Sequence, residues 1–446
     1  MKIFILSLFV FLLSGCGGET KEVIKEVEII KEVEVIKEVV VEVPAPEPDP
    51  LPLPKMLAEW TGYYSSWWEI PQYYNGIPKY SAAKGTYTHK HQYMAVYRNG
   101  MLFSVRTDNT EDENFYVYVM KDGVSVKVHT ILNWDDPHTN ASINLDDNGY
   151  VWVHIASRGL AHKFQSGKIL KSKTPYELDF ECVDGCSDLN INYEAYPQVH
   201  NTAWGMHLIY TRYEQDYEGG INQRRLWSRA GGERVKLSKL AHYSVSNFDS
   251  VSNKLCVASN TLINGLPDKR VNLSVICTDQ DGNWYKSNGD PVNFSQIDES
   301  DRVVYETESW ETFVYLKDII SIDGKLRVLF VESSTSDPTK GHRYLKEWIQ
   351  GEGVKIVAYV GHNYSAGSYI EKNDELYIAL GQSAVQYYLS GIVELYNSDY
   401  DLIDTLEDGG EYSYIRRVIG TDGMAVMSRG RSDVKERGQH YILTLQ

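Results

Sequence analysis

The chain has 446 residues, with 44 Lys and Arg against 61 Asp and Glu, so its formal net charge at pH 7 is −17. Phosphate binding calls for a basic face, and this charge balance argues against a nucleic-acid partner. The length exceeds that of a usual domain, although all-β propellers and barrels often reach it as single units.

The first residues have the features of a secretory signal. Lys2 precedes an apolar run that is too short for a retained spanning helix and that ends in small residues. Leu13-Ser14-Gly15-Cys16 resembles the lipobox of bacterial lipoproteins, which implies that residues 1–15 are removed and that Cys16 is lipidated. Because Gly17 stands where an inner-membrane retention signal usually has Asp, we expect the protein at the outer membrane or the cell surface.

Residues 16–54 are predicted to be a lipid-anchored tether. Residues 19–43 repeat with a period of six, which fits neither the heptad nor the eleven-residue helical repeat, so no coiled coil is predicted. The Pro-rich stretch at residues 44–54 favours a stiff, extended segment. A disordered linker without a specific partner is nearly the same interpretation. The folded domain is then residues 55–446.

This domain is predicted to be an all-β, seven-bladed propeller. Short runs rich in Val, Ile, Tyr and Trp alternate with turn residues, and no long stretch has helical periodicity. A turn that leads into an apolar strand recurs seven times at spacings of about 45 residues. The seven turns are Arg98-Asn99-Gly100, Asp147-Asn148-Gly149, Ala203-Trp204-Gly205, Val251-Ser252-Asn253, Ile322-Asp323-Gly324, Lys372-Asn373-Asp374 and Thr421-Asp422-Gly423.

Two further stretches support the propeller. Thr278 to Tyr285, TDQDGNWY, resembles the Asp-box turn between outer strands of sialidase-like propellers. WTGYYSSWWEI, residues 60–70, is expected to close the ring against the C-terminal HYILTLQ. Because propellers bind ligands at the mouth of the central channel, function is expected in polar residues near the strand ends of neighbouring blades.

The stretch from Tyr196 to Tyr213, YPQVHNTAWGMHLIYTRY, is predicted to be a β-hairpin. If the turn centres on Trp204, Tyr196 lies opposite Arg212, at the short Cβ separation of a cross-strand pair. A guanidinium there would lower the pKa of Tyr196 and prepare it for proton transfer near neutral pH. The plain alternative is a surface cation–π pair, which is common.

Cys182 and Cys186, and Cys256 and Cys277, remain besides Cys16. Outside the cytoplasm, two disulfides are the default expectation. A structural zinc site is the alternative, because the C-x-x-x-C spacing is close to that of zinc ligands. The cysteines are expected to be structural, with Cys256 and Cys277 on neighbouring strands and the other two in a loop beside the hairpin.

Four segments resemble the BNR-repeat family that includes the propeller-type ulvan lyases: DPHTNASINLDDNGYVWV, AYPQVH, LIYTRY and LKEWIQGEGVKIVAYVGHNYSAGSYI. The resemblance runs through most of residues 84–380. It implies that His138 and Tyr196 are the acid–base residues and that Arg212 neutralises a carboxylate. Where the family has a second active-site His, about twenty residues after the first, this chain has Arg158.

Elimination on a uronate polymer explains these residue types. The proton at C5 is removed only if the adjacent carboxylate is neutralised, and Arg grips a carboxylate with two parallel hydrogen bonds. Tyr and His then act as base and acid, so no metal or cofactor is required for catalysis. The expected substrate-binding residues are Asn140, His154, Arg158, Arg225, His242 and Tyr243, whereas Arg224 is expected to be a solvated surface residue.

The function predicted is therefore that of a monomeric polysaccharide lyase acting on a sulfated, ulvan-like uronate polymer. Two other classes remain open. A sialidase-like glycoside hydrolase would need an arginine cluster and an acidic group, and a glycan-binding lipoprotein would use the same pocket without turnover.

Overall fold

A computed structural model of the chain describes residues 9–13, 21–30, 33–42, 53–69, 73–74, 77–78, 81–83, 88, 91–108, 115–131, 138, 140–156, 167–186, 194–215, 222–263, 268–295, 299–337, 340–382, 392–407, 411–430 and 437–446. The chain divides into two compact units, Met1–Leu53 and Pro54–Gln446. The second unit begins one residue before the folded domain that we predicted.

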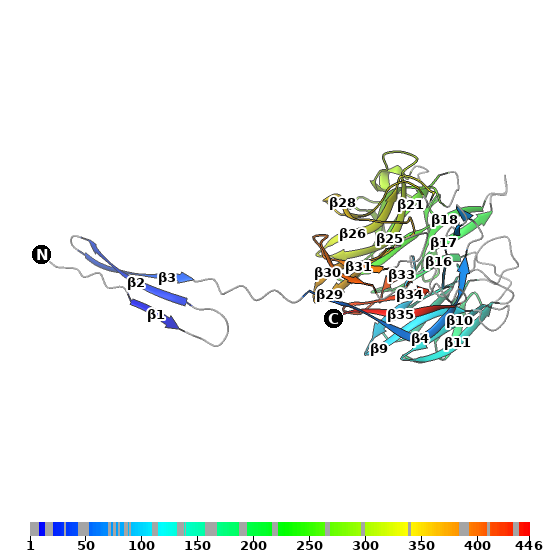
Figure 1. Cartoon of the computed structure of the whole chain (residues 1–446), viewed down its shortest axis with the longest axis horizontal. Helices are drawn as coiled ribbons and strands as arrows, with labels where there is room; N and C mark the ends of the chain where they lie inside the picture. Colours follow the sequence, from blue (N-terminus) through cyan, green and yellow to red (C-terminus); the bar gives the residue numbers. More distant parts are fainter. Residues whose placement is uncertain are drawn as a thin grey trace. The chain divides into compact units, whose positions relative to one another are not determined.

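The first unit contains one antiparallel sheet in the order β1-β2-β3 (Figure 1). Its strands are β1 (Phe9–Leu13), β2 (Lys21–Ile30) and β3 (Val33–Glu42). Cys16, the predicted lipidation site, lies outside the described residues. Among the residues that the structure describes, no helix is both long and apolar enough to cross a membrane.

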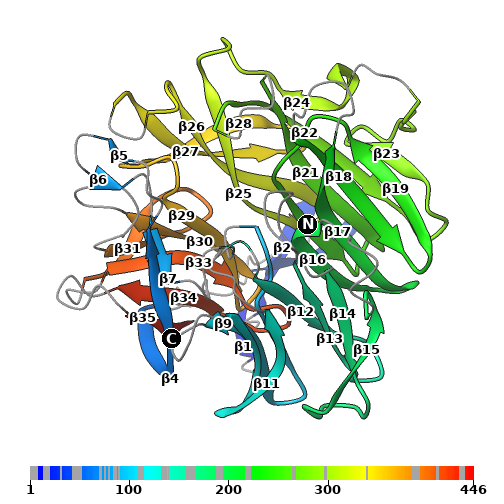
Figure 2. The same ribbon diagram turned by 90° about the vertical axis from the view of Figure 1, so that its right-hand side faces the viewer.

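The second unit is the predicted all-β propeller of seven blades, arranged around a central axis in Figure 2. Blades 1 to 3 consist of β8 (Ala95–Arg98), β9 (Met101–Asp108), β10 (Phe115–Lys121) and β11 (Val124–Ile131); β12 (Ala141–Leu145), β13 (Val151–Ile155), β14 (Lys168–Ser172) and β15 (Phe180–Asp184); and β16 (Glu194–Thr202), β17 (Gly205–Gln215), β18 (Asn222–Ala230) and β19 (Glu233–Ser238).

Blades 4 to 7 consist of β20 (Ser244–Asp249), β21 (Lys254–Leu262), β22 (Arg270–Thr278), β23 (Trp284–Lys286) and β24 (Val303–Tyr305); β25 (Phe313–Ile322), β26 (Lys325–Ser333), β27 (Arg343–Ile349) and β28 (Gly353–Tyr359); β29 (Ala366–Lys372), β30 (Glu375–Gln382), β31 (Ile392–Tyr396) and β32 (Leu402–Leu406); and β33 (Glu411–Arg417), β34 (Met424–Gly430), β35 (Arg437–Leu445) and β4 (Met56–Glu69). The remaining elements are β5 (Tyr73–Tyr74), β6 (Ile77–Pro78), β7 (Ser81–Ala83), which pairs with β4, and the short 3-10 helix η3 (Ser300–Arg302).

Each of the seven predicted turns joins the first and second strands of one blade. The prediction succeeded because these turns need left-handed backbone, which Asn, Asp and Gly adopt with little strain. Asn99, Asn253, Asp323 and Asn373 all have φ between 51° and 54°. Local turn chemistry therefore identified the repeat.

Two other predictions are confirmed. β4 pairs with β35, so residues from the start of the domain close the ring against its end. The Asp-box-like segment lies between β22 and β23, where the Asp279 Oδ1 accepts hydrogen bonds from the backbone N–H groups of Asp281 (2.9 Å) and Asn283 (3.1 Å).

The core lies between blades rather than in one centre. One hydrophobic cluster joins strands of blades 1 and 2, and others join blades 4 and 5, 5 and 6, and 6 and 7. Because neighbours cover both faces of a blade, inner strands such as β12 and the first eight residues of β25 are buried throughout.

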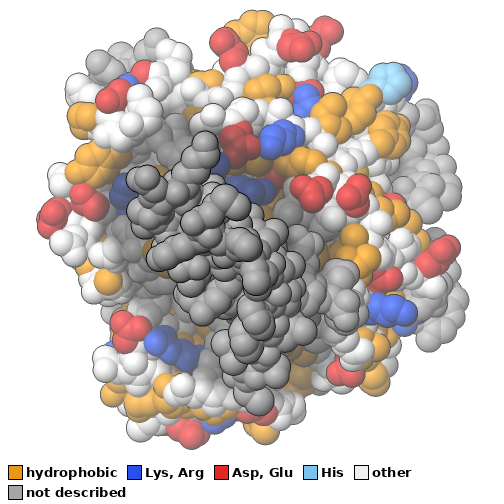
Figure 3. Space-filling view, turned by 90° about the vertical axis from the view of Figure 1, so that its left-hand side faces the viewer, with side chains coloured by type: hydrophobic (Ala, Val, Ile, Leu, Met, Phe, Trp, Pro, Cys, Tyr) orange, Lys and Arg blue, Asp and Glu red, His pale blue; other side chains and the backbone are white. Residues whose placement is uncertain are grey.

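The first strands run in the same direction, which gives the propeller two distinct ends. We call the end where they begin the site face, and the end with the seven turns the hairpin face. Figure 2 is seen from the site face. Figure 3 is seen from the hairpin face, where acidic and basic side chains both occur around the rim.

Candidate functional site

The predicted hairpin of β16 and β17 forms, but Tyr196 does not lie opposite Arg212. Arg212 pairs with Glu194, and a β-bulge places Tyr196 and Pro197 opposite a single residue. The turn holds two residues, so its centre also falls half a residue before Trp204. The two-residue turn shifts the pairing of the strands by one position from the predicted one, and the bulge shifts it by one more. Each shift of one position turns a side chain to the other face of the sheet. The predicted Tyr196–Arg212 pair is therefore wrong.

The bulge directs Tyr196 towards the channel. Tyr196 has φ 52° and is 1 % exposed, an uncommon backbone conformation for a bulky residue. Bulges of this kind re-aim a side chain near functional sites, and strain of about 1–3 kcal/mol persists only where the surroundings hold it. An unfavourable conformation at a buried Tyr is a reason to examine what surrounds its ring.

Three histidines and a second tyrosine surround the Tyr196 ring. Its centroid lies 5.6 Å from that of His91, 5.9 Å from His138, 5.4 Å from His242 and 4.8 Å from Tyr243. The hydroxyl of Tyr196 donates to that of Tyr243 at 3.4 Å. The structure thus brings together four residues predicted from the sequence, His138, Tyr196, His242 and Tyr243. We call them, with His91, the histidine–tyrosine cluster.

The surrounding contacts orient the cluster. His91 stacks on Tyr243 with ring centroids 4.3 Å apart, and the Tyr213 hydroxyl lies 3.0 Å from Nε2 of His242. Burial raises the pKa of Tyr243, although the charge of Arg270 opposes the shift. His91 and Tyr213 were missed, because a His before a strand and a Tyr within one carry no sequence signal of a shared site.

The predicted arginines lie differently from expectation. Arg212 faces Trp227, with its Cζ 5.8 Å from the ring, and Arg225 is the strand partner of Arg212 on the same side of blade 3. Arg224 instead pairs with Tyr213 and has its Cζ 5.4 Å from that ring, on the side of the cluster. Arg224, which we expected to be a solvated surface residue, thus packs on the Tyr213 ring, and the expectation that Arg225 binds substrate stays a prediction.

Two further predicted residues have polar partners outside the histidine–tyrosine cluster. His154 is fully buried, and its Nε2 lies 2.9 Å from Glu194 Oε2 across the interface of blades 2 and 3. Asn140 is also buried; its side-chain oxygen accepts a hydrogen bond from Thr107, and its carbonyl accepts one from Gln92. Arg158 lies outside the described residues.

Two buried cations lie beyond Tyr243. The Arg270 Cζ is 4.0 Å from the Tyr243 ring centroid and 4.8 Å from that of Tyr315. Lys317 donates to the backbone oxygen of Asn363 at 2.9 Å. Both cations are 2 % exposed. The sequence did not single out either residue.

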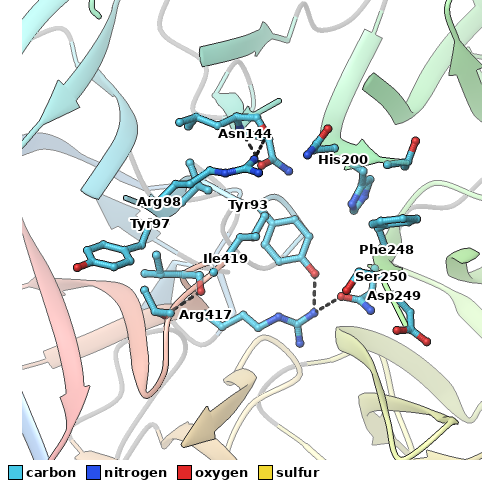
Figure 4. A pocket seen from close by; sticks show the side chains of 18 of the residues that line it. Tyr93, Tyr97, Arg98, Asn144, His200, Phe248, Asp249, Ser250, Arg417 and Ile419 are labelled. Atoms are coloured by element: carbon cyan, nitrogen blue, oxygen red, sulfur yellow. Dashed lines mark hydrogen bonds between the residues drawn. The ribbon is translucent and has the colours of Figure 1, made fainter. Parts of the chain in front are cut away.

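A polar network crosses the channel between its two ends. Tyr93 of the segment before blade 1 donates to the Ser246 oxygen of blade 4 at 2.9 Å and accepts from Arg417 of blade 7 at 2.8 Å. Arg417, whose bond to Tyr93 is drawn in Figure 4, also donates to Asn247 at 2.8 Å. Because these residues come from opposite sides of the ring, their bonds can form only across its axis.

On the hairpin side of this network lies a cavity of about 810 Å³, lined by residues that include Arg98, Asn144, His200, Phe248 and Asp249 (Figure 4). Arg98 is bonded to Asp147 at 3.0 Å, and Asp249 accepts from Ser321 at 2.8 Å. Burial, followed by the charges of His207 and two arginines, lowers the pKa of His200 to about 3, so its ring is neutral. Arg98, Asp249 and His200 each have a hydrogen-bond partner in the protein. We therefore look for the groups that transfer protons on the site face.

The cysteines form two disulfides, Cys182–Cys186 and Cys256–Cys277. The zinc alternative is therefore wrong, because the thiolates that zinc needs are oxidised. Cys256 and Cys277 are direct cross-strand partners on β21 and β22, as predicted, but Cys182 lies in β15 rather than in a loop. In the described part of the chain, no group of three or more His, Cys, Asp or Glu is arranged to hold a metal ion.

No protein-family model matches the chain, and no curated protein matches it. Solved structures that resemble it include the α-L-arabinanase of Penicillium chrysogenum with arabinobiose (9 % identity, 70 % of this chain and 95 % of that one, TM-score 0.43). Others are the sialidase of Trypanosoma rangeli with sialic acid (9 %, 87 % and 58 %, 0.40) and the propeller domain of the Trilobed protease of Pyrococcus furiosus (11 %, 79 % and 95 %, 0.43). At such identities the likeness concerns the fold alone.

Proposed function

We propose that the protein is a polysaccharide lyase that cleaves an anionic, uronate-containing polymer by β-elimination on the site face. The observation that carries the proposal is the buried Tyr196, held in left-handed backbone with His91, His138 and His242 around its ring. The resemblance of the sequence to the ulvan lyases supports the same chemistry. The proposal includes the expected sulfated substrate and the lipid anchor at Cys16.

In this mechanism, Tyr196 and His138 share proton transfer. One removes the proton at C5 of the uronate, and the other protonates the glycosidic oxygen as its bond to C4 breaks. The electron pair left at C5 forms the C4–C5 double bond of the product. A cation must stabilise the charge that develops on the carboxylate, and Arg212 does not lie against Tyr196.

A glycoside hydrolase is the second candidate, but most such enzymes use two carboxylic acids across the scissile bond. The described rings around Tyr196 belong to His and Tyr, which suits removal of a carbon-bound proton better than attack by water. A glycan-binding protein would need neither the strained Tyr196 nor the histidines aimed at it.

The test is the ultraviolet absorbance of unsaturated uronate during digestion of ulvan-type polymers. Tyr196→Phe keeps the ring and removes the exchangeable proton, so turnover should fall by ~10²–10⁴-fold while the folded protein persists. Tyr414→Phe is the matched control, because Tyr414 is also 1 % exposed with φ 52° in a bulge of a first strand.

Tyr414→Phe should keep full activity. New reducing ends without the chromophore would favour the hydrolase, and no new ends with retained polymer binding would favour the binding protein. Near-full lyase activity of Tyr196→Phe would move the catalytic centre elsewhere on the propeller.

A further inference from the structure

The wall of the channel beyond Tyr243 contains a pair of basic side chains that the mechanism above does not use. We propose that Arg270 and Lys317 form an oxyanion subsite that receives a carboxylate or sulfate group of the polysaccharide. The inference rests on the proposed function for its substrate, although the binding of the anion can be measured without catalysis.

A bulge places Lys317 at this position, as another places Tyr196. Leu316 pairs with Phe330 and Asp318 with Leu329, so Lys317 is the extra residue of β25. Its amine donates to the Asn363 backbone oxygen at 2.9 Å. An ammonium group has three donor hydrogens, so this bond leaves capacity for a ligand.

The nearest acidic residue in sequence does not neutralise Lys317. Asp318 is fully buried and binds Arg416 (2.8 Å) and Arg417 (3.4 Å) instead. Among the described residues, no carboxylate lies within ion-pair distance of the Lys317 amine. Burial without a carboxylate disfavours the ammonium form, so the Lys317 amine gives up its proton readily unless a negative group arrives to favour the charged form.

Arg270 adds a permanent charge, which the neighbouring Asp268 carboxylate partly balances. A guanidinium keeps its proton at any working pH, and its planar fork suits the oxygens of carboxylate and sulfate. The contact with Tyr243, 4.0 Å from the Arg270 Cζ, places this charge directly beside the histidine–tyrosine cluster. An anion held here would bring the neighbouring sugar carbons towards Tyr196.

The charged groups around Lys317 predict how anion binding changes the protonation of its amine. Burial, followed by the charge of Arg270 on β22, holds the pKa of Lys317 well below its usual value. Arg416 on β33 donates to the Lys317 carbonyl, and Arg343 on β27 binds the side chain of Asn363. Asp318 adjoins Lys317 but is held by the two arginines of β33. An arriving oxyanion favours the charged amine, so binding should take up a proton.

The experiment is isothermal titration of the full chain with glucuronate, inorganic sulfate and, as a neutral control, glucose. Each titration is made near pH 7.5 in two amine buffers of different ionisation enthalpy. We expect an anion to bind with an enthalpy that depends on the buffer, which reports proton uptake. Lys317→Met should weaken that binding by about 10-fold or more and remove the buffer dependence.

Lys346→Met is the control, because Lys346 lies on β27 of the same blade and pairs with Glu332. It should bind the anions as the unchanged protein does. Lys317→Met should be at least as stable as the unchanged protein, since an apolar side chain replaces a buried amine whose charged form is unfavourable. If Lys317 served only to hold the fold together, Lys317→Met would instead clearly lower the free energy of unfolding.

The outcomes separate the subsite from the lyase. Binding of glucuronate alone assigns a carboxylate, and binding of sulfate alone assigns a sulfate ester; both support the subsite. If neither anion binds, or if Lys317→Met binds equally well, the subsite is overturned even where the unchanged protein forms unsaturated uronate. If the anions bind with proton uptake but no unsaturated product ever forms, the subsite stands and the lyase proposal fails.

Discussion

At the scale of single residues, a side chain's role follows from the face of the strand to which it points. Tyr213 and Arg212 are adjacent on β17, yet Tyr213 contacts His242 and Arg212 contacts Trp227. Because successive side chains of a strand point to opposite faces, adjacent residues here serve different blade interfaces.

This geometry changes what is expected of Arg212. Its guanidinium lies against Trp227, and its strand partner Glu194 is bonded to His154. Arg212→Lys keeps the charge on that side of the blade, so kcat/KM on ulvan-type polymer should fall less than about tenfold. Steady-state kinetics by absorbance would check this, and a loss of more than about a hundredfold would restore Arg212 as the carboxylate-binding residue.

His207 illustrates a residue that affects stability through its protonation. The Trp204 indole N–H donates to its Nδ1 at 3.3 Å, and its Nε2 lies 2.5 Å from the Ser228 hydroxyl. The indole bond requires an unprotonated Nδ1, and burial lowers the pKa of His207 to about 4.

Because the folded pKa of His207 is below the unfolded value of about 6.5, the unfolded state binds the proton more readily, and stability falls as pH drops from 6.5 towards 4. Between pH 7.5 and 5, His207 should account for about 2 kcal/mol of the lost unfolding free energy. Urea unfolding at the two pH values checks this. His207→Gln should lose about that much less than the unchanged protein, and an equal loss would contradict the assignment.

At the scale of elements, ring closure depends on one strand. β4 forms the outer strand of blade 7 by pairing with β35, and Met56 of β4 is buried in the cluster between blades 6 and 7. An open propeller would expose that cluster and the edge of β35, and exposed edges favour aggregation.

Truncation tests this closure. Removing residues 1–53, which form their own compact unit, should leave the unfolding free energy of the propeller nearly unchanged. Removing residues 1–69 deletes β4 as well and should lower it by more than about 3 kcal/mol, because buried side chains and a complete strand ladder are lost. Urea unfolding of the two truncated chains gives the comparison. Equal stability would show that β4 does not hold the ring closed.

At the scale of the whole molecule, buried charges link blades that are not neighbours. Asp318 of blade 5 binds Arg416 and Arg417 of blade 7, and Arg417 reaches Tyr93 and Asn247 on the other side of the channel. These contacts link blades 4, 5 and 7 and the segment before blade 1 through one network.

Asp318→Asn would leave two buried guanidinium groups without their carboxylate. Breaking such a pair typically lowers stability by about 3–5 kcal/mol, because the remaining charge is uncompensated. Denaturant unfolding should show a loss of that size. Asp404→Asn is the surface comparison, since its carboxylate accepts a backbone hydrogen bond at the outer edge of the ring. A loss below about 1 kcal/mol for Asp318→Asn would mean that the network adds little to closure.

The sequence by itself determined the repeat and the strands. Turn residues and strand periodicity act over a few positions, so the seven hairpins, the closing strand and the cross-strand Cys256–Cys277 pair were all predictable. Four residues of the histidine–tyrosine cluster were also named in advance, His138 and Tyr196 from the resemblance to the ulvan lyases, and His242 and Tyr243 from their place between the hairpin and the next blade.

Only the tertiary structure decided which side chains face one another. A single extra residue at Tyr196 helped to move Arg212 away from it, and another at Lys317 set its amine against the Asn363 backbone oxygen. A bulge forms where neighbouring blades hold it in place, so its position depends on contacts between residues far apart in the chain. His91 comes from the segment before blade 1, so only the folded ring brings it beside Tyr196 of blade 3. Arg270 and Tyr243 both belong to blade 4, where pairing of its strands brings them together.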